Sequence, residues 1–195
     1  NPAPYYHFGV YDLNATPATG YSFSQWTGDV TDVTDINASH TTITMFADAN
    51  VTAEFTMNSY LLMVNAGAGG TATGTGTFLH NANAPIVAIP LEGYEFTGWT
   101  GDVNGTITDL LDANTTIDMS VKGTNLTIAA TFDLKEYALT VTANAGGDAN
   151  GSGTFEHNST VPVIATPLTG WSFDYWSGTI SALDNDQNAT ATATI

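Results

Sequence analysis

Aspartates gather in the loop that follows each copy of a repeated tryptophan motif, and oxygen-rich loops of this kind could bind calcium. The six that we consider as ligands are Asp29, Asp32, Asp35, Asp102, Asp109 and Asp112. Calcium takes about six to eight oxygen ligands, and carboxylates are common among them. The spacing matches no EF-hand, however, and threonine-rich solvated loops explain the aspartates equally well. Calcium therefore stays open as the one cofactor that the sequence offers.

Three of the four histidines occupy the same position of a repeat. His7, His80 and His157 are separated by 73 and 77 residues, and His40 stands apart from them. A zinc site needs about three or four ligands gathered together, which one histidine per repeat cannot supply. We expect instead a structural side chain that hydrogen-bonds a hairpin in each repeat.

No arrangement of residues predicts catalysis. No nucleophile stands beside a histidine in a recognisable motif, and no glycine-rich loop carries the lysine of a phosphate site. Carboxylates are paired only in the aspartate loops, where no pocket is expected, so glycosidase chemistry has no support. We predict that the protein is not an enzyme.

Asparagine is often followed by the acceptor pattern for N-glycosylation, Asn-x-Ser/Thr with x not proline. The nine positions are Asn14, Asn37, Asn50, Asn104, Asn114, Asn125, Asn150, Asn158 and Asn188. Chance would give roughly three to four such patterns in a chain of this composition. The excess favours glycosylation of some sites, and threonine-rich strands flanked by asparagine turns are the alternative explanation.

These residues are organised around a ten-residue motif that occurs three times. It reads GYSFSQWTGD at 20–29, GYEFTGWTGD at 93–102 and GWSFDYWSGT at 170–179. Its tryptophans are 73 and 77 residues apart, and a long fixed period indicates tandem modules. The modules are residues 1–59, 60–136 and 137–195. The first lacks an opening strand and the last a closing strand.

The motif predicts a strand that runs into a turn. Its aromatic residues alternate with strand period, but the tryptophan comes three residues after the phenylalanine. A bulge near residues 24–25 or 97–98 would return the tryptophan to the core face. The predicted core residues are Tyr21, Phe23, Trp26, Tyr94, Phe96, Trp99, Trp171, Phe173 and Trp176. An exposed aromatic platform for sugars is the functional alternative.

The chain as a whole predicts an all-β protein with almost no helix. Threonine, valine, isoleucine and glycine are abundant, and no long helical stripe appears. In the middle module we expect strands at 60–66, 84–90, 115–121 and 126–132, a hairpin returning through 75–78, and one helical turn at 109–112. The strands expected in the outer modules are 11–16, 41–46, 51–55, 137–143 and 190–195.

Charge excludes some partners. Two lysines and no arginine stand against 19 acidic residues, a net charge of −17, so phosphate contacts to nucleic acid are not expected. An anionic membrane surface would repel the chain, and no apolar run reaches the roughly 18 residues of a membrane span. There is no cysteine. The charge suits a solvated outer surface.

The repeat resembles a known family, the divergent internalin-B-type (Listeria–Bacteroides) bacterial repeat domain. The shared order is Y-x-L-x-V, then G-x-G-T-F, then P-x-x-G-Y-x-F-x-x-W-x-G-D, N-x-T and T-F, and it covers nearly the whole chain. The resemblance implies small β-grasp-like or β-sandwich modules of secreted and surface-anchored proteins, without catalytic residues. The chain departs from the pattern in its scarcity of Lys and Arg, and at Thr179, which replaces the aspartate after the third WSG.

We therefore expect an extracellular or cell-surface structural repeat protein that builds a stalk, fibre, filament or envelope layer through self-association. Its partners would be neighbouring repeats or subunits. The alternative is a carbohydrate-binding or adhesive accessory module of a larger secreted protein, with surface glycans as partners.

The missing strands predict an unpaired sheet edge in each terminal module, which is a template for strand pairing. Either the chain is a slice of a longer array, or neighbouring subunits donate strands and form a filament. Abutting two copies end to end does not restore complete modules, because each of the two that meet would still lack a strand. This arithmetic favours a slice.

Overall fold

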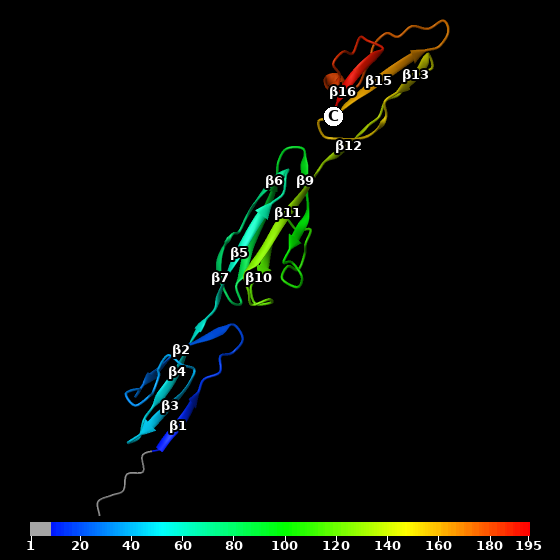
Figure 1. Cartoon of the computed structure of the whole chain (residues 1–195). Helices are drawn as coiled ribbons and strands as arrows, with labels where there is room; N and C mark the ends of the chain where they lie inside the picture. The colour runs from blue at the N-terminus through cyan, green and yellow to red at the C-terminus, as the bar shows by residue number, and fades with distance from the viewer. Residues whose placement is uncertain (1–8) are drawn as a thin grey trace, which may run out of the picture.

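Three β-modules follow one another in a line (Figure 1). The structure is a computed structural model that describes residues 9–195. His7 lies outside the described residues. The described chain contains no α-helix and only one 3₁₀ turn, η1 at Ile180–Ala182, so the all-β prediction is confirmed. No helix in residues 9–195 is long and apolar enough to cross a membrane.

The middle module is a sandwich of two sheets. Its strands are β5 (Ser59–Ala66), β6 (Gly70–Thr73), β7 (Gly76–Leu79), β8 (Asn83–Pro90), β9 (Tyr94–Gly101), β10 (Asn114–Asp118) and β11 (Leu126–Leu134). One sheet has the order β10-β8-β6 and the other the order β7-β5-β11-β9. Strands β5 and β11 are parallel, whereas the other neighbours are antiparallel. The two sheets enclose a single apolar core.

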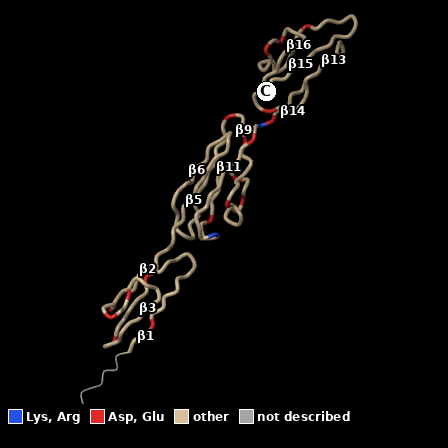
Figure 2. Tube along the Cα trace, viewed as in Figure 1, with Lys and Arg blue, Asp and Glu red and all other residues tan. Residues whose placement is uncertain are grey.

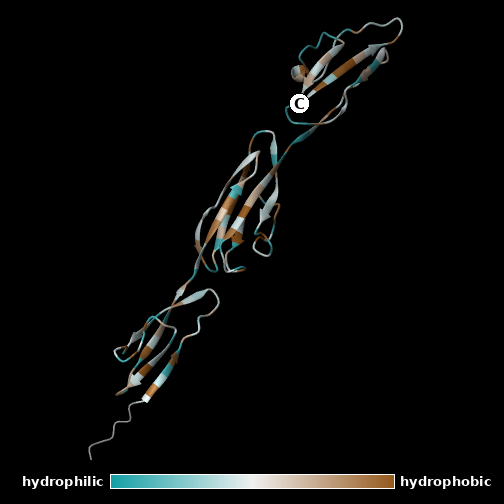
Figure 3. Cartoon of the chain, viewed as in Figure 1, coloured by the Kyte–Doolittle hydropathy of each residue, from teal (hydrophilic) through white to brown (hydrophobic). Residues whose placement is uncertain are grey.

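Alternating apolar residues build this core. Ala84, Ile86 and Ala88 of β8 point inward, and Leu126, Ile128, Ala130 and Phe132 of β11 meet them from the other sheet. This spacing of two is what a strand needs to bury one face. Figure 3 shows the same alternation of hydrophobic and hydrophilic residues along the strands.

The first module contains the second half of this sandwich. Its strands are β1 (Gly9–Asn14), β2 (Tyr21–Gly28), β3 (His40–Met45) and β4 (Val51–Met57). They form two two-stranded sheets, β1-β3 and β2-β4, which correspond to β8-β10 and β9-β11. Within the described residues, β4 is paired only with β2. Its counterpart in the middle module, β11, is paired on its other edge with β5, and the described part of the first module has no strand in that position.

The third module contains the first half. Its strands are β12 (Glu136–Leu139), β13 (Gly147–Asn150), β14 (Gly153–Glu156), β15 (Thr160–Pro167) and β16 (Thr190–Thr194). The order is β12-β14 in one sheet and β13-β15-β16 in the other. Our expectation of a strand in the third tryptophan motif is wrong: residues 171–178 have no ladder partner and form no strand. The predicted strand 137–143 also ends early, at Leu139.

The bulge predicted within the tryptophan motif is confirmed. The register of β2 against β4 shifts between Phe23 and Gln25. In β9 the partner of Gly98 is Thr131, whereas the partner of Phe96 is Phe132, so the extra residue is Thr97. The shift brings the tryptophan side chain to the same face as the phenylalanine.

Other details differ from the sequence prediction. The glycine-rich segment after β5 does return through β7, but β6 crosses first to the opposite sheet and pairs with β8. Residues 109–112 form a turn and no helix. The strand expected at 115–121 is β10, which ends at Asp118.

Candidate functional site

The connection between consecutive modules is a single residue. Only Asn58 lies between β4 and β5, and its backbone N–H donates to the Gly20 carbonyl over 2.8 Å. Its own carbonyl accepts from the backbone N–H of His80, also over 2.8 Å. The linker is therefore bonded to both modules.

A histidine and a glycine close this joint. Gly20 has φ +81°, and a Cβ added there would overlap the His80 ring. His80 is 6% exposed, and its ring meets that of Tyr60 edge-on with centroids 6.1 Å apart. The tryptophan motif thus begins with a glycine because the histidine of the next module occupies the space of a side chain.

The second joint repeats the first. Lys135 is the single linker: its N–H donates to the Gly93 carbonyl and its carbonyl accepts from His157 N–H, both over 2.8 Å. A Cβ added at Gly93, which has φ +78°, would overlap the His157 ring. Tyr137 stands 6.0 Å from that ring. The two joints thus have the same construction.

The expected role of the recurring histidine needs correction. We predicted a side chain that hydrogen-bonds a hairpin, but His80 Nδ1 is buried without a hydrogen-bond partner. The ring acts by packing between two modules. His40, which does not belong to the series, is exposed at the start of β3.

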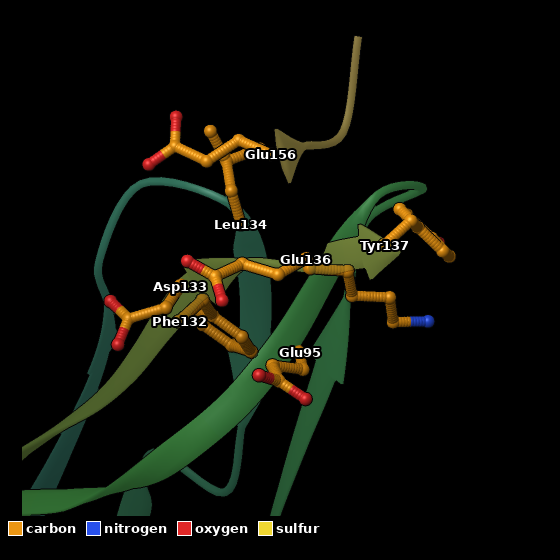
Figure 4. Close-up of a pocket in the computed structure, with 8 residues that line it drawn as sticks. Glu95, Phe132, Asp133, Leu134, Glu136, Tyr137 and Glu156 are labelled. Atoms are coloured by element: carbon orange, nitrogen blue, oxygen red, sulfur yellow. The ribbon is translucent and has the colours of Figure 1, made fainter. Parts of the chain in front are cut away.

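The second joint carries four acidic residues beside Lys135, the linker residue. Glu95, Asp133, Glu136 and Glu156 line a hollow of about 640 Å³ between the modules (Figure 4). Glu95 lies opposite Asp133 across β9 and β11, and Glu136 lies opposite Glu156 across β12 and β14. The corresponding pairs of the first joint are uncharged, Ser22 with Thr56 and Ser59 with Leu79. The acidic residues elsewhere are spread over all three modules (Figure 2).

Each motif tryptophan points inward and donates one hydrogen bond from its indole nitrogen to a backbone carbonyl. Trp26 is 7% and Trp99 2% exposed. Their Nε1 atoms donate to the carbonyls of Ala38 over 2.9 Å and Asp112 over 3.0 Å, and Trp176 Nε1 donates to Asn188 over 2.9 Å. The preceding phenylalanines, Phe23, Phe96 and Phe173, lie 5.5 to 5.6 Å from them. Buried rings present no face to a sugar, whereas Trp176 is partly exposed.

The prediction that Trp171 belongs to the core is wrong, because this side chain is 61% exposed. Its counterparts Tyr21 and Tyr94 are half-buried. In those modules the position stands on a paired strand, β2 or β9, whereas residue 171 belongs to a segment without a ladder partner.

Most of the candidate calcium ligands accept hydrogen bonds from backbone N–H groups. Asp29 Oδ2 accepts from Asn50 and Asp102 Oδ2 from Thr127, both over 2.9 Å. Asp35, Asp109 and Asp112 each accept from the N–H two residues ahead. Asp32, which is exposed, accepts no such backbone bond from residues 9–195. Within residues 9–195, no three His, Asp or Glu residues lie close enough to hold a metal ion.

The Asp102 carboxylate accepts two hydrogen bonds. The hydrogen bond from Thr127 N–H lowers its pKa most, and Lys122 adds to this, with Nζ 2.9 Å from Oδ1. This is the single ion pair of the described chain. The Thr127 bond ties the end of β9 to the start of β11, and the ion pair joins the same carboxylate to the turn before β11. At Thr179, the third copy of this position, the residue precedes η1 and makes no side-chain capping bond.

The nine acceptor asparagines are all exposed. Two of them use their side-chain oxygen internally: Asn125 Oδ1 accepts from Leu61 N–H over 2.9 Å, and Asn188 Oδ1 accepts from Thr190 N–H over 3.2 Å. Asn158 forms a turn with φ +62°.

The fold and the joints define a tandem all-β repeat protein in which each module is built around one tryptophan. A family model, the divergent InlB B-repeat domain, matches residues 4–59, 60–136 and 137–195. The chain therefore belongs to this family of cell-surface repeat modules, and no catalytic family was found in it. Neither the curated proteins nor the solved structures gave a match.

Sequence reasoning found the recurring histidine and the recurring glycine but missed that they meet. The signal was present, because both residues recur with the period of the tryptophan. Asn58 and Lys135 gave no signal, since only their backbone atoms make the bonds that repeat.

Proposed function

We propose that this chain is a non-catalytic stalk or filament segment of an extracellular surface protein, whose main contacts are with neighbouring repeats. The observation that carries the proposal is the repeated joint. A linker of one residue, bonded on both sides and flanked by a packed histidine, leaves consecutive modules little freedom to swing.

The surface chemistry supports the same function. A net charge of −17 favours hydration and repels other acidic surfaces, which keeps an extended chain from collapsing on itself. All nine acceptor asparagines lie on the outside, so glycans could be attached without disturbing the modules. We therefore include N-glycosylation at some of these sites in the proposal.

Small-angle scattering of the full chain tests the stalk. The wild type should give a maximum dimension that fits three modules in line. Gly20→Ala should broaden the distance distribution, because its Cβ displaces His80. Gly170→Ala is the matched control: its φ of +88° gives similar backbone strain, but no atom lies within 4 Å of the added Cβ.

Two results would contradict the proposal. One is a wild-type chain whose scattering requires freely jointed modules. The other is an equal effect of the two glycine substitutions, since the histidine contact would then contribute nothing. Mass spectrometry of protein purified from its native source checks the glycans separately.

A further inference from the structure

The two lysines are the only positions in the sequence where an endopeptidase that cuts after basic residues could act, because there is no arginine. Lys122 lies in the turn 119–125, between β10 and β11 of the middle module, and Lys135 is the linker of the second joint (Figure 2). Both residues are exposed. Exposure alone therefore does not distinguish the two positions.

The backbone of Lys135 is held on both sides. Its N–H donates to the Gly93 carbonyl and its own carbonyl accepts from His157 N–H, each over 2.8 Å. A protease needs a segment that is free to enter its cleft, so cleavage here requires the joint to open first. Glu136 follows Lys135, and Asp133 lies two residues before it. A pocket that binds lysine through negative charge is repelled by such neighbours.

The segment 121–124, by contrast, has a free backbone. It lies between two anchors: Ser120 N–H donates to Asp118 Oδ1 over 2.8 Å, and Asn125 Oδ1 accepts from Leu61 N–H over 2.9 Å. Within the described chain, no backbone N–H or C=O between these anchors forms a hydrogen bond. The segment can therefore leave the turn without losing a backbone bond, and exposed turns of this kind are preferred sites of proteolytic cleavage.

The side chain of Lys122 is held only by the exposed ion pair with Asp102. The Nζ–Oδ1 distance is 2.9 Å, and 33% and 43% of the two side chains are exposed. Ion pairs in such positions contribute little stability. The surrounding sequence, SVKGTN at 120–125, contains no acidic residue and no proline. Both the backbone and the side chain are thus accessible at Lys122.

We propose that the Lys122–Gly123 bond is a processing site for an endopeptidase that cuts after lysine, and that the two products stay together through strand β11. Water is the second reactant of this hydrolysis. The amide bond breaks, the carbonyl carbon of Lys122 takes the water oxygen and becomes a carboxylate, and the nitrogen of Gly123 becomes an ammonium group.

Strand β11 begins directly after the cut and would hold the products together. It belongs to the C-terminal product, whereas its neighbours β5 and β9 belong to the N-terminal product. Five residue pairs join it to β5 and seven join it to β9. Leu126, Ile128, Ala130 and Phe132 of β11 lie in the core and are at most 8% exposed. Separation of the products would expose this apolar surface to water, which is unfavourable.

The cut changes how the third module is attached. Before it, the covalent chain joins the third module to the first two. After it, only β11 joins them, so the attachment becomes an equilibrium that dilution, denaturant or a competing strand can shift. Release of the third module in this way rests on the proposed stalk, whereas the cleavage site and the retention by β11 do not.

Limited digestion of the full chain with trypsin, which cuts after lysine, tests the site directly. The first products should have the masses of residues 1–122 and 123–195. They should elute together from a size-exclusion column and separate in urea. Cleavage at Lys122 should be at least about tenfold faster than at Lys135, because the joint must break two backbone hydrogen bonds before it can be cut.

Variants separate the contribution of the free backbone from that of exposure. Lys122→Gln should stay uncut under the same conditions, and Lys135→Gln should be cut like the wild type. Adding Thr116→Lys to Lys122→Gln places an exposed lysine on β10, opposite Pro85, and this paired strand should resist cleavage. Circular dichroism checks that each variant is folded. In protein from the native source, end-group analysis under denaturing conditions should find chains that begin at Gly123.

Four results would overturn the inference. Cleavage that begins at Lys135 would contradict the choice of site, and equally fast cleavage of the Thr116→Lys variant would show that exposure alone determines the rate. Products that separate on the column without urea would contradict the retention by β11. Native protein in which every chain continues through Gly123 would remove the processing role. Scattering from freely jointed modules would contradict the stalk and leave these four measurements unchanged.

Discussion

At the residue scale, the tryptophan of the motif holds each module together by both its ring and its nitrogen. Trp99 is 2% exposed, packs against Phe96 and donates to the Asp112 carbonyl. That bond ties the loop after β9 to the core. Hence one side chain fixes both the sheet and the loop that returns to β10.

Trp99→Ala should therefore destabilise the middle module by about 3–5 kcal/mol, the usual cost of deleting a large buried aromatic side chain. Trp171→Ala is a suitable control, because Trp171 is 61% exposed and exposed substitutions usually stay within about 0.5 kcal/mol. Urea denaturation of both variants measures the difference. A loss below about 1 kcal/mol for Trp99→Ala, far under the buried range, would return the tryptophan to the candidate sugar-binding residues.

The carboxylate of Asp102 makes stability depend on pH. Hydrogen bonding by Thr127 N–H, and then Lys122, lowers its pKa in the folded chain. A lowered pKa means that the folded state favours the ionised form, so the stabilisation is full above the ordinary aspartate pKa of about 3.9. It is lost as pH falls through the lower folded pKa.

Asp102→Asn should accordingly lower the melting temperature at neutral pH and have a shrinking effect as the pH falls below about 4. Lys122→Met should reproduce only part of the loss, because the Thr127 bond is the larger cause. Thermal melts between neutral and strongly acidic pH make the comparison. An effect of Asp102→Asn that is independent of pH would show that its charge is irrelevant.

At the scale of elements, the two joints differ in charge although they share a backbone construction. Like charges directly opposite each other across a pair of strands are destabilising. The second joint has two such pairs, Glu95 with Asp133 and Glu136 with Glu156, where the first joint has neutral residues. The second joint should thus be the more sensitive to ionic strength.

Glu136→Gln should stabilise the chain at low salt by a few tenths to about 1 kcal/mol, and added sodium chloride should diminish that gain. Ser59→Gln, the matched change at the first joint, should give no salt-dependent gain. Melting curves across a sodium chloride series provide the measurement. If the stability gain of Glu136→Gln does not change with sodium chloride concentration, charge repulsion at the second joint is not its cause. A stabilisation by calcium that persists in saturating sodium chloride would point to bound ions in the acidic loops or the joint.

Much of each element could be predicted from the sequence, because inward and outward residues alternate clearly. The strands at 60–66, 84–90 and 126–132 were predicted to within about two residues, and the bulge followed from the odd spacing between Phe96 and Trp99. The third motif misled the prediction. Residues 171–178 have the composition of a strand, but a strand also needs a partner along its edge, and local sequence does not report one.

At the scale of the whole molecule, the repeat indicated the modules and their family, but not how modules are connected. Each joint consists of a histidine ring, a glycine without a side chain and two backbone hydrogen bonds, so in the sequence it appears only as isolated single residues. The period alone could not distinguish flexibly linked modules from a stiff stalk, since that difference depends on whether His80 and Gly20 are in contact. The aspartates show the converse: their composition suggested metal ligands, whereas five of the six accept backbone hydrogen bonds, three of them within turns.

The parallel pairing of β5 and β11 determines how the middle module carries mechanical load. The chain enters this module through β5 and leaves it through β11, and these two strands are direct neighbours that run along its long axis (Figure 1). Tension between the two joints pulls the entry strand one way and the exit strand the other. The hydrogen bonds between the two strands are then loaded in shear, so they bear the force together and do not break one after another. The same ladder that completes the sandwich is thus a tension clamp in line with the pulling direction.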